Sequence, residues 1–300
     1  MTGAMVGSHY SHRTLAACFA MALFVGLVAA SPGYAQVAVT SSTLVERSAA
    51  PGETYRGTIA IHNSSNSVQV VSFSLADYGF YADGSTTFDE PGSQPRSNSG
   101  WIGLGQRAVS VLPHADAAVS YTVAVPSTTP PFGTYWSVVL VEAVHTSEAS
   151  PGPTGLAIVP RFRYAVQVAT HIERTGEPTL AFGTPNLLRR SLAVDIMSAG
   201  VPGLSQSEAD SVLAPDYTLA LDISHAGTRA CRPTLRLEVY RTDGTLAHSA
   251  SAQRGLLYPG TSIRQIFELP LLSPGDYTVL LLADVGADKV QGTKFEVHVQ

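Results

Sequence analysis

The feature that most constrains this chain is an alternation of apolar and polar side chains with a period of two residues. The alternation recurs in short segments along most of the sequence. In "AAVSYTVAVP" (117–126), for example, Val119, Tyr121, Val123 and Val125 fall on one face. This period is typical of β-strands with one buried face, and turns rich in Pro and Gly separate the segments. Because no long helical period accompanies it, the pattern predicts an all-β protein built from β-sandwiches.

Three features of the first half predict particular strand arrangements. The alternating segments 54–63 and 68–77 flank the polar turn "SSNS" (64–67), which predicts a β-hairpin. The pair Asp83-Gly84 predicts a further tight turn. The segment "GTYWSVVLVEAV" (133–144) is apolar on both faces, as expected for a central strand that is covered on both sides.

The second half repeats the alternating pattern and predicts a second sandwich of similar type. Its alternating segments are 217–224, 234–240, 262–269, 276–285 and 294–300. Gly and Pro interrupt the pattern between the two halves. We therefore expect a first sandwich over residues 36–173, a linker over 174–178 and a second sandwich over 179–300.

Residues 1–35 have the composition of a signal peptide. His and Arg residues precede an apolar run over 15–30, and small residues follow up to Ala35. The run is short for a membrane span, which needs about 20 residues. We predict cleavage after Ala35, with an uncleaved anchor as the alternative. In either case we expect export to the periplasm or the cell surface.

The net charge bears on which partners the protein can bind, and the number of cysteines bears on whether it can form an internal disulfide. The net charge is −5, and only Lys289 and Lys294 of the 18 basic residues are lysines. Because phosphate binding needs a concentrated basic surface, we exclude nucleic acid as a partner. Cys18 lies in the predicted signal peptide, so Cys231 has no partner for an internal disulfide. We expect Cys231 to be a small buried hydrophobic residue rather than a reactive thiol.

No motif predicts catalysis, a metal site or a cofactor. The histidines show neither H-E-x-x-H nor another close ligand spacing. Asp77, Asp83 and Asp89 lack the spacing of a calcium loop, and turn chemistry is the better interpretation. Serine never occurs in a G-x-S-x-G elbow. We therefore predict a non-enzymatic protein with no cofactor and no catalytic residues.

The segment "GLAIVPRFRYAVQVATHI" (155–172) combines an apolar face with a doubled positive charge. Its apolar face carries Leu156, Ile158 and Phe162, and its other face carries Arg161 and Arg163. A guanidinium binds a carboxylate through two parallel hydrogen bonds, so one interpretation is an anchor for an anionic group of a partner. The alternative is that the charges keep a sheet edge from pairing with the wrong strand.

The order of several motifs carries a resemblance to a known family. These motifs are "PGETYRGTIAIHNSS", "ADYGFYADGS", "WIGL", "VSVLPHADAAVSYTVAVP", "GTYWSVVLVEA" and "PRFRYAVQV". Over residues 36–172 the chain resembles the amino-terminal immunoglobulin-like domain of PapD-like periplasmic pilus-assembly chaperones. It resembles still more closely uncharacterised exported bacterial proteins built on that domain. The resemblance implies two tandem immunoglobulin-like sandwiches after a signal peptide.

The resemblance also implies roles for individual residues. The chaperones hold the carboxyl terminus of a bound subunit with an arginine on their first strand and a lysine on their last. Arg47 corresponds to the first position, and Arg163 or its neighbour Arg161 to the second. The family also donates an alternating apolar strand to the subunit, and the face of Leu156, Ile158 and Phe162 would be that strand.

These observations together predict a protein that acts by contact with other proteins. The expected mechanism is edge-strand pairing plus the arginine anchor, in a role that is chaperone-like or accessory to the assembly of a surface appendage. The expected partner is a protein subunit of that structure, and the oligomeric state is left open. The alternative is a structural or glycan-binding envelope module, for which Trp101, Tyr135 and Trp136 would be the aromatic candidates.

Overall fold

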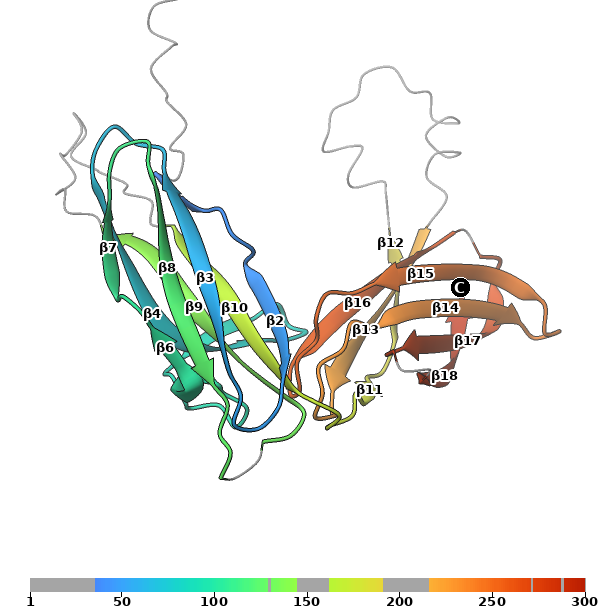
Figure 1. Ribbon diagram of the computed structural model, residues 1–300. Coiled ribbons are helices and arrows are strands. Elements are labelled where there is room, and N and C mark those ends of the chain that lie inside the picture. Colours follow the sequence, from blue (N-terminus) through green and yellow to red (C-terminus); the bar gives the residue numbers. More distant parts are fainter. Residues whose placement is uncertain are drawn as a thin grey trace, which may run out of the picture.

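The computed structural model describes residues 36–128, 131–144, 162–190, 216–270, 272–286 and 289–299. The predicted signal peptide over 1–35 lies outside this part of the chain and stays a prediction. Figure 1 shows two β-sandwiches that meet at one end in a bent arrangement. The predicted all-β, immunoglobulin-like fold is confirmed, because strands and their turns account for the described elements apart from one short 3-10 helix at Ser99–Trp101.

The first sandwich contains the first ten strands, in two sheets. The strands are β1 (Val37–Val39), β2 (Leu44–Ala49), β3 (Thr54–Asn63), β4 (Gln69–Phe80), β5 (Thr86–Asp89), β6 (Ile102–Leu104), β7 (Ala108–Val111), β8 (Asp116–Ala124), β9 (Thr134–Val144) and β10 (Arg163–Ile172). Among the described residues one sheet has the order β1-β3-β8-β6. The other has the order β2-β10-β9-β4-β5, and β7 also pairs with β4.

The second sandwich contains the remaining strands, again in two sheets. The strands are β11 (Leu180–Phe182), β12 (Asn186–Arg190), β13 (Asp216–His225), β14 (Thr234–Arg241), β15 (Leu246–Gln253), β16 (Ser262–Leu269), β17 (Gly275–Asp284) and β18 (Val290–Val299). In one sheet β13 lies between β16 on one side and β11 and β12 on the other. The other sheet has the order β15-β14-β17-β18 within the described residues.

The alternating segments bury the side chains that the sequence predicts. Val119, Tyr121 and Val123 of β8 are almost completely buried in the first core. The strand β9 lies between β10 and β4, as predicted for a segment that is apolar on both faces. Cys231 is buried in the second core, and this burial raises the pKa of its thiol to about 11. The expectation that Cys231 packs as a small hydrophobic residue is therefore confirmed.

The predicted hairpin over 54–77 is wrong. The strand β3 pairs with β1 and β8, whereas β4 pairs with β5, β7 and β9 in the opposite sheet. The connection therefore crosses from one sheet to the other. Asn63 holds this crossing, since its side-chain amide donates to the carbonyls of Ser67 (2.8 Å) and Val111 (3.0 Å). Alternation and a polar turn identify two strands, but they do not identify the sheet to which each belongs.

One contact in the second sandwich is characteristic of immunoglobulin-like folds. Tyr277 lies near the start of β17, and its hydroxyl donates to the backbone carbonyl of Ser273 at 2.8 Å. This is the arrangement called a tyrosine corner, which fixes the turn that leads into such a strand. No helix in the described residues is long and apolar enough to cross a membrane.

Candidate functional site: the interdomain junction and the edge of strand β10

The backbones of the two sandwiches are in direct contact at the junction. The amide N–H of Thr134 in β9 donates to the carbonyl of Thr228 in the second sandwich at 2.9 Å. Gly133 precedes it with a φ of 76°, and a Cβ atom there would lie 2.0 Å from the same carbonyl oxygen. A side chain at position 133 is therefore disfavoured both by the backbone conformation and by the close approach. The glycine allows the two domains to contact each other through their backbones.

An aromatic stack joins the two sandwiches beside this backbone contact. The rings of Trp136 in β9 and Tyr258 in the loop before β16 lie 4.6 Å apart and 10° from parallel. The ring of Phe80 meets Tyr258 edge-on at 6.3 Å, and Ala169 is buried in the same cluster. The hydroxyl of Tyr258 donates to the side-chain oxygen of Gln167 at 2.9 Å. Because the hydroxyl of Tyr258 has a hydrogen-bond partner, its ring can be buried at the junction, where the contact stabilises one relative orientation of the domains.

A charged cluster forms a third part of the junction. Glu46 in β2 accepts hydrogen bonds from Arg232 of the second sandwich and from Nε2 of His171 (3.0 Å). Burial alone raises the pKa of Glu46, but the bonds from Arg232 and His171 outweigh it and hold that pKa below its ordinary value. Thr134 completes the cluster, because its hydroxyl contacts Nδ1 of His171 (2.8 Å) and accepts the amide N–H of Ala230 (2.9 Å).

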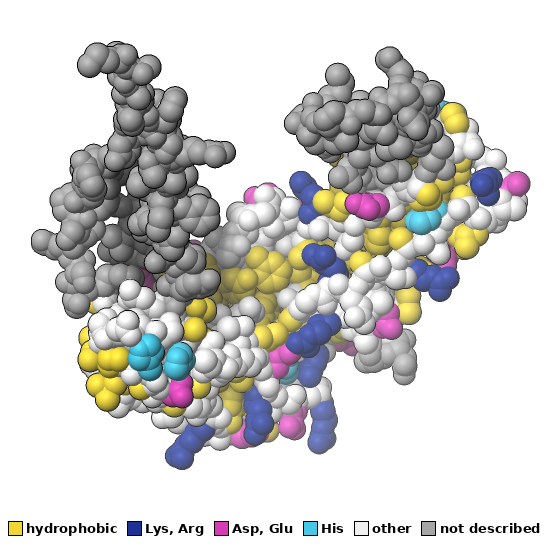
Figure 2. Space-filling model, turned by 90° about the horizontal axis from the view of Figure 1, so that it is seen from above, with side chains coloured by type: hydrophobic (Ala, Val, Ile, Leu, Met, Phe, Trp, Pro, Cys, Tyr) yellow, Lys and Arg dark blue, Asp and Glu magenta, His cyan; other side chains and the backbone are white. Residues whose placement is uncertain are grey.

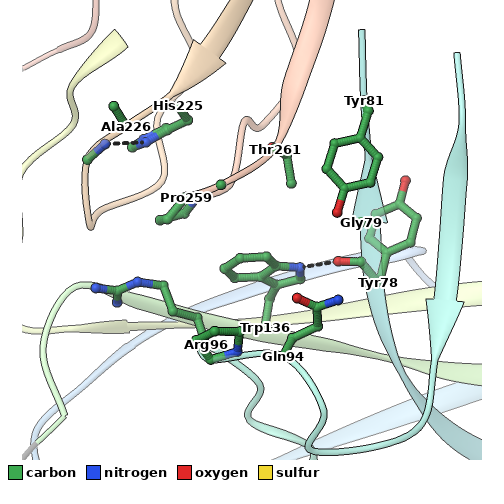
Figure 3. Close-up of a pocket in the computed structure, with 13 residues that line it drawn as sticks. Tyr78, Gly79, Tyr81, Gln94, Arg96, Trp136, His225, Ala226, Pro259 and Thr261 are labelled. Atoms are coloured by element: carbon green, nitrogen blue, oxygen red, sulfur yellow. Dashed lines mark hydrogen bonds between the residues drawn. The ribbon is translucent and has the colours of Figure 1, made fainter. Parts of the chain in front are cut away.

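A cleft of about 440 Å³ opens between the sandwiches on one side of the aromatic stack (Figure 3). The first sandwich contributes Tyr78, Arg96 and Trp136 to the lining of this cleft, and the second sandwich contributes His225. Nδ1 of His225 accepts the amide N–H of Gly227 (3.1 Å), and Nε2 donates to the carbonyl of Arg229. Burial lowers the pKa of His225, consistent with this neutral tautomer.

The polar groups of this cleft hold the structure together. The indole N–H of Trp136 donates to the carbonyl of Tyr78 at 2.7 Å. The guanidinium of Arg96 donates to the carbonyls of Phe132 and Thr134. These donors are therefore engaged within the chain. Within the residues that the structure describes, no group of three His, Cys, Asp or Glu side chains could hold a metal.

A second cleft, of about 360 Å³, lies at the same junction and is more apolar. Its walls include Leu44, Phe80 and Ile263, with Arg254 at one side. The Nε of Arg254 is buried and has no hydrogen-bond partner among the described residues. Figure 2 shows apolar side chains gathered in the hollow between the two sandwiches. The junction therefore combines an apolar surface with a guanidinium that lacks a carboxylate partner in the described chain.

The structure does not bring the predicted anchor residues together. Arg47 in β2 is opposite Thr170 of β10, whose side chain is buried on the inner face of the sheet. Arg163 lies seven residues before Thr170, which corresponds to roughly 23 Å along the strand. It also lies on the outer face, since strand residues alternate between the two faces. A single carboxylate cannot contact both guanidinium groups.

The predicted site residues that the structure describes differ in their exposure and in their contacts. Arg47 is exposed on β2. Arg163 is exposed and forms an ion pair with Glu142, its neighbour on β9, at 2.9 Å. Phe162 is 45% exposed, directly before β10. The remaining predicted residues, Leu156, Ile158 and Arg161, lie outside the described residues, so nothing tests their roles.

The edge of β10 is covered over only part of its length. The strand β2 pairs with β10 in parallel from Gln167 to Ile172. Among the described residues no strand pairs with this side of β10 over 163–166. Gln167 donates its N–H to Thr43 across this edge at 2.8 Å, so the backbone groups of Arg163 and Ala165 face the same side. The start of β10 therefore presents an open edge within the described part of the chain.

The aromatic residues proposed for glycan binding do not form an exposed platform. Trp136 is buried against Tyr258, as described above. The rings of Trp101 and Tyr135 lie 4.7 Å apart, and both pack against the first core. Sugar binding needs an exposed aromatic face. The structure gives these residues a packing role.

One sequence signal for the junction is the apolar character of both faces of β9, which predicted that the strand is covered on both sides but not which part of the chain covers it. Both faces of β9 are apolar, and the face that carries Trp136 lies outside the sandwich core. An apolar outer face on a sandwich strand must be covered by another part of the molecule. Arg254, Tyr258 and Arg232 carry no comparable signal, because their neighbours at the junction are distant in the sequence.

Comparisons with known proteins found similar solved structures at low sequence identity. No family model and no curated protein matches the chain. One similar solved structure is a chaperone–tip adhesin complex of CFA/I fimbriae biogenesis (11% identity, 87% of this chain and 98% of that chain, TM-score 0.43). Another is the class 5 fimbriae chaperone CfaA (12% identity, 87% of this chain and 98% of that chain, TM-score 0.41). A third is the CsuC–CsuE pre-assembly complex of Acinetobacter baumannii (8% identity, 77% of this chain and 90% of that chain, TM-score 0.39).

The predicted likeness to PapD-like fimbrial chaperones is confirmed as a likeness to solved structures of such proteins. At these identities and TM-scores the likeness assigns no activity to this chain. The function therefore has to be argued from the site itself.

Proposed function

We propose that this protein binds an extended polypeptide at the open edge of β10, in a chaperone-like or accessory role in the assembly of a surface structure. The observation that carries the proposal is the incomplete cover of this strand. Pairing with β2 begins at Gln167, and residues 163–166 have no strand beside them among the described residues. An incoming strand would continue the line of β2 and complete the sheet by β-augmentation.

The backbone of β10 has the right orientation for such pairing. The N–H and C=O groups of Arg163 and Ala165 face the open side, whereas those of Tyr164 and Val166 face β9. Main-chain hydrogen bonds give affinity in this binding mode, and pockets for alternate side chains give specificity. The second cleft includes Gln167, the residue directly after this edge, and would receive such side chains.

The charge at this edge favours an acidic group on the partner. Arg163 is paired with Glu142, but about half of its side chain is exposed and a guanidinium has five donors. We do not retain Arg47 in the same anchor, because it lies on the other face of the sheet. The role of Arg163 is therefore proposed as a local contact next to the paired strand, rather than as one half of a clamp.

The proposal can be tested by cross-linking in the envelope of the producing cell. A photo-reactive phenylalanine analogue at Phe162 should capture a polypeptide partner, because this side chain lies beside the open edge. The same analogue at Phe88 is a matched control, since both phenylalanines are 45% exposed. The substitution Ala165→Pro should abolish the cross-link, because it removes an N–H that faces the open edge. Ala165→Ser keeps that N–H and should retain the cross-link.

Three outcomes would contradict the proposal. One is equal capture from positions 162 and 88. Another is an equal effect of Ala165→Pro and Ala165→Ser in variants whose thermal unfolding matches that of the wild type. The third is capture of a glycan in place of a polypeptide at position 162, which would support the envelope-module alternative.

A further inference from the structure

The outermost strand of one sheet in the second sandwich has an unusual outer face. The strand β16 pairs with β13 on one side, and no described strand pairs with its other side (Figure 1). Along β16 the buried residues alternate with three exposed ones, Arg264, Ile266 and Glu268. Ile266 is 54% exposed, which is high for an isoleucine in a strand. A basic, an apolar and an acidic side chain therefore follow one another at two-residue steps.

The backbone of the same residues faces the open edge. The N–H of His225 in β13 donates to the carbonyl of Thr261 at 2.9 Å. Thr261 and the odd-numbered residues after it therefore face β13, and the even-numbered residues face away from it. Gln265 caps part of this edge, because its side-chain amide donates to the carbonyl of Ile266 at 2.7 Å. A carbonyl oxygen accepts two hydrogen bonds, so this cap leaves room for a second donor.

We propose that β16 pairs with β16 of a second copy of this protein, in an antiparallel register centred on Ile266. A two-fold axis through this point places Ile266 against its own copy. It also places Arg264 of each chain opposite Glu268 of the other. The two sheets would join into one continuous sheet across the dimer.

The sign of the charges selects this register. In a parallel, in-register pair Arg264 would face Arg264 and Glu268 would face Glu268, and like charges opposite each other destabilise a sheet. In the antiparallel pair both positions have opposite charges on the partner. Charged edge strands usually resist pairing with a copy of themselves, but this order of charges is complementary to itself.

The ion pair that Arg264 forms within the chain does not prevent the pairing. Arg264 donates through Nε and Nη2 to the carboxylate of Asp222 at 2.7 and 3.0 Å. This ion pair orients the guanidinium and leaves its remaining donors for a second carboxylate. A carboxylate likewise accepts several hydrogen bonds, so Glu268 can keep its contacts within the chain.

The oligomeric state of charge variants tests the proposal. Sedimentation equilibrium of the purified wild type should give a concentration-dependent dimer. Arg264→Glu and Glu268→Arg should each be monomeric at concentrations where the wild type is dimeric, because each variant places like charges opposite each other. An equimolar mixture of the two variants should recover the dimer, since every charged pair is then again opposite in sign. This recovery cannot come from a variant that has failed to fold.

A control variant separates this edge from a general charge effect. Lys294→Glu reverses an exposed charge on β18, the edge strand of the other sheet, and should leave the dimer unchanged. A wild type that is monomeric at all concentrations would overturn the proposal. It would also be overturned by a mixture that stays monomeric, or by loss of the dimer in Lys294→Glu. None of these outcomes bears on the open edge of β10, which lies in the other sandwich.

Discussion

The ring of Trp136 in the first sandwich stacks on the ring of Tyr258 in the second sandwich at a centroid distance of 4.6 Å, although the two residues are distant in the sequence. Both side chains are buried at the junction. The glycine-mediated backbone contact at Gly133 and the ion pair of Glu46 with Arg232 also join the two sandwiches. Three independent kinds of interaction therefore fix the angle between the domains. The apolar hollow and both clefts depend on that angle.

Truncation of Tyr258 should uncouple the two domains. We expect Tyr258→Ala to lower the free energy of unfolding by about 3–5 kcal/mol, as for other buried aromatic truncations. Tyr258→Phe keeps the ring and loses only the hydrogen bond to Gln167, which is worth about 1 kcal/mol. Calorimetry should show one transition for the wild type and Tyr258→Phe, and two for Tyr258→Ala. A single unshifted transition in Tyr258→Ala would show that the stack does not couple the domains.

Gly133→Ala should disturb the junction far more than a glycine substitution at a free turn. The Cβ atom would be 2.0 Å from the carbonyl oxygen of Thr228, in addition to the cost of the positive φ. Gly244→Ala is the matched control, because its φ of 82° is similar and no atom lies within 4 Å of the added Cβ. We expect Gly244→Ala to lower the free energy of unfolding by about 1 kcal/mol. Gly133→Ala should lower it by about 1–3 kcal/mol more, as measured by urea unfolding. Equal losses would mean that the domains separate easily at this point.

The junction should lose stability in mild acid. Burial lowers the pKa of His171, and although Glu46 opposes this effect, the pKa stays below its ordinary value. The folded state therefore favours the neutral imidazole. Its contribution is fully present above the unfolded pKa of about 6.5 and is lost as the pH falls below that value towards the folded pKa.

The pH dependence can be assigned with a variant. The pKa of buried His225 is also lowered, so His171→Gln should flatten the fall of stability below pH 6.5 without removing it. Urea unfolding at a series of pH values between about 7 and 5 measures this slope. The same slope in the wild type and in His171→Gln would refute the assignment to His171.

Cys231 should be unreactive in the folded protein. Burial raises the pKa of its thiol to about 11, and the thiolate is the reactive form. We expect slow labelling by a thiol reagent at pH 8 and fast labelling once urea unfolds the chain. Fast labelling of the folded protein would show that the second core opens locally around Cys231.

The sequence by itself determined the long alternating strands, several turns and many residues of each core. Alternation places Val119 and Tyr121 inside, and Asp83-Gly84 forms the expected turn after β4. These features could be predicted because they depend on neighbours within a few residues: the period of a strand is local, and so is the backbone preference of a turn. The same reasoning predicted that β9 would be covered on both faces.

Only the tertiary structure decided which strands pair and which side chains meet. The segments before and after Asn63 have the pattern of a hairpin, yet they belong to opposite sheets. Arg47 lies on β2 and Arg163 lies on β10, and these two strands pair with each other. The register nevertheless places the two side chains on opposite faces of the sheet and far apart. The contact of Trp136 with Tyr258 joins residues more than a hundred positions apart. The local alternation would be the same in other arrangements of these strands, so it cannot distinguish between them. Pairing and register depend instead on the packing of the whole sheet and on the angle between the domains.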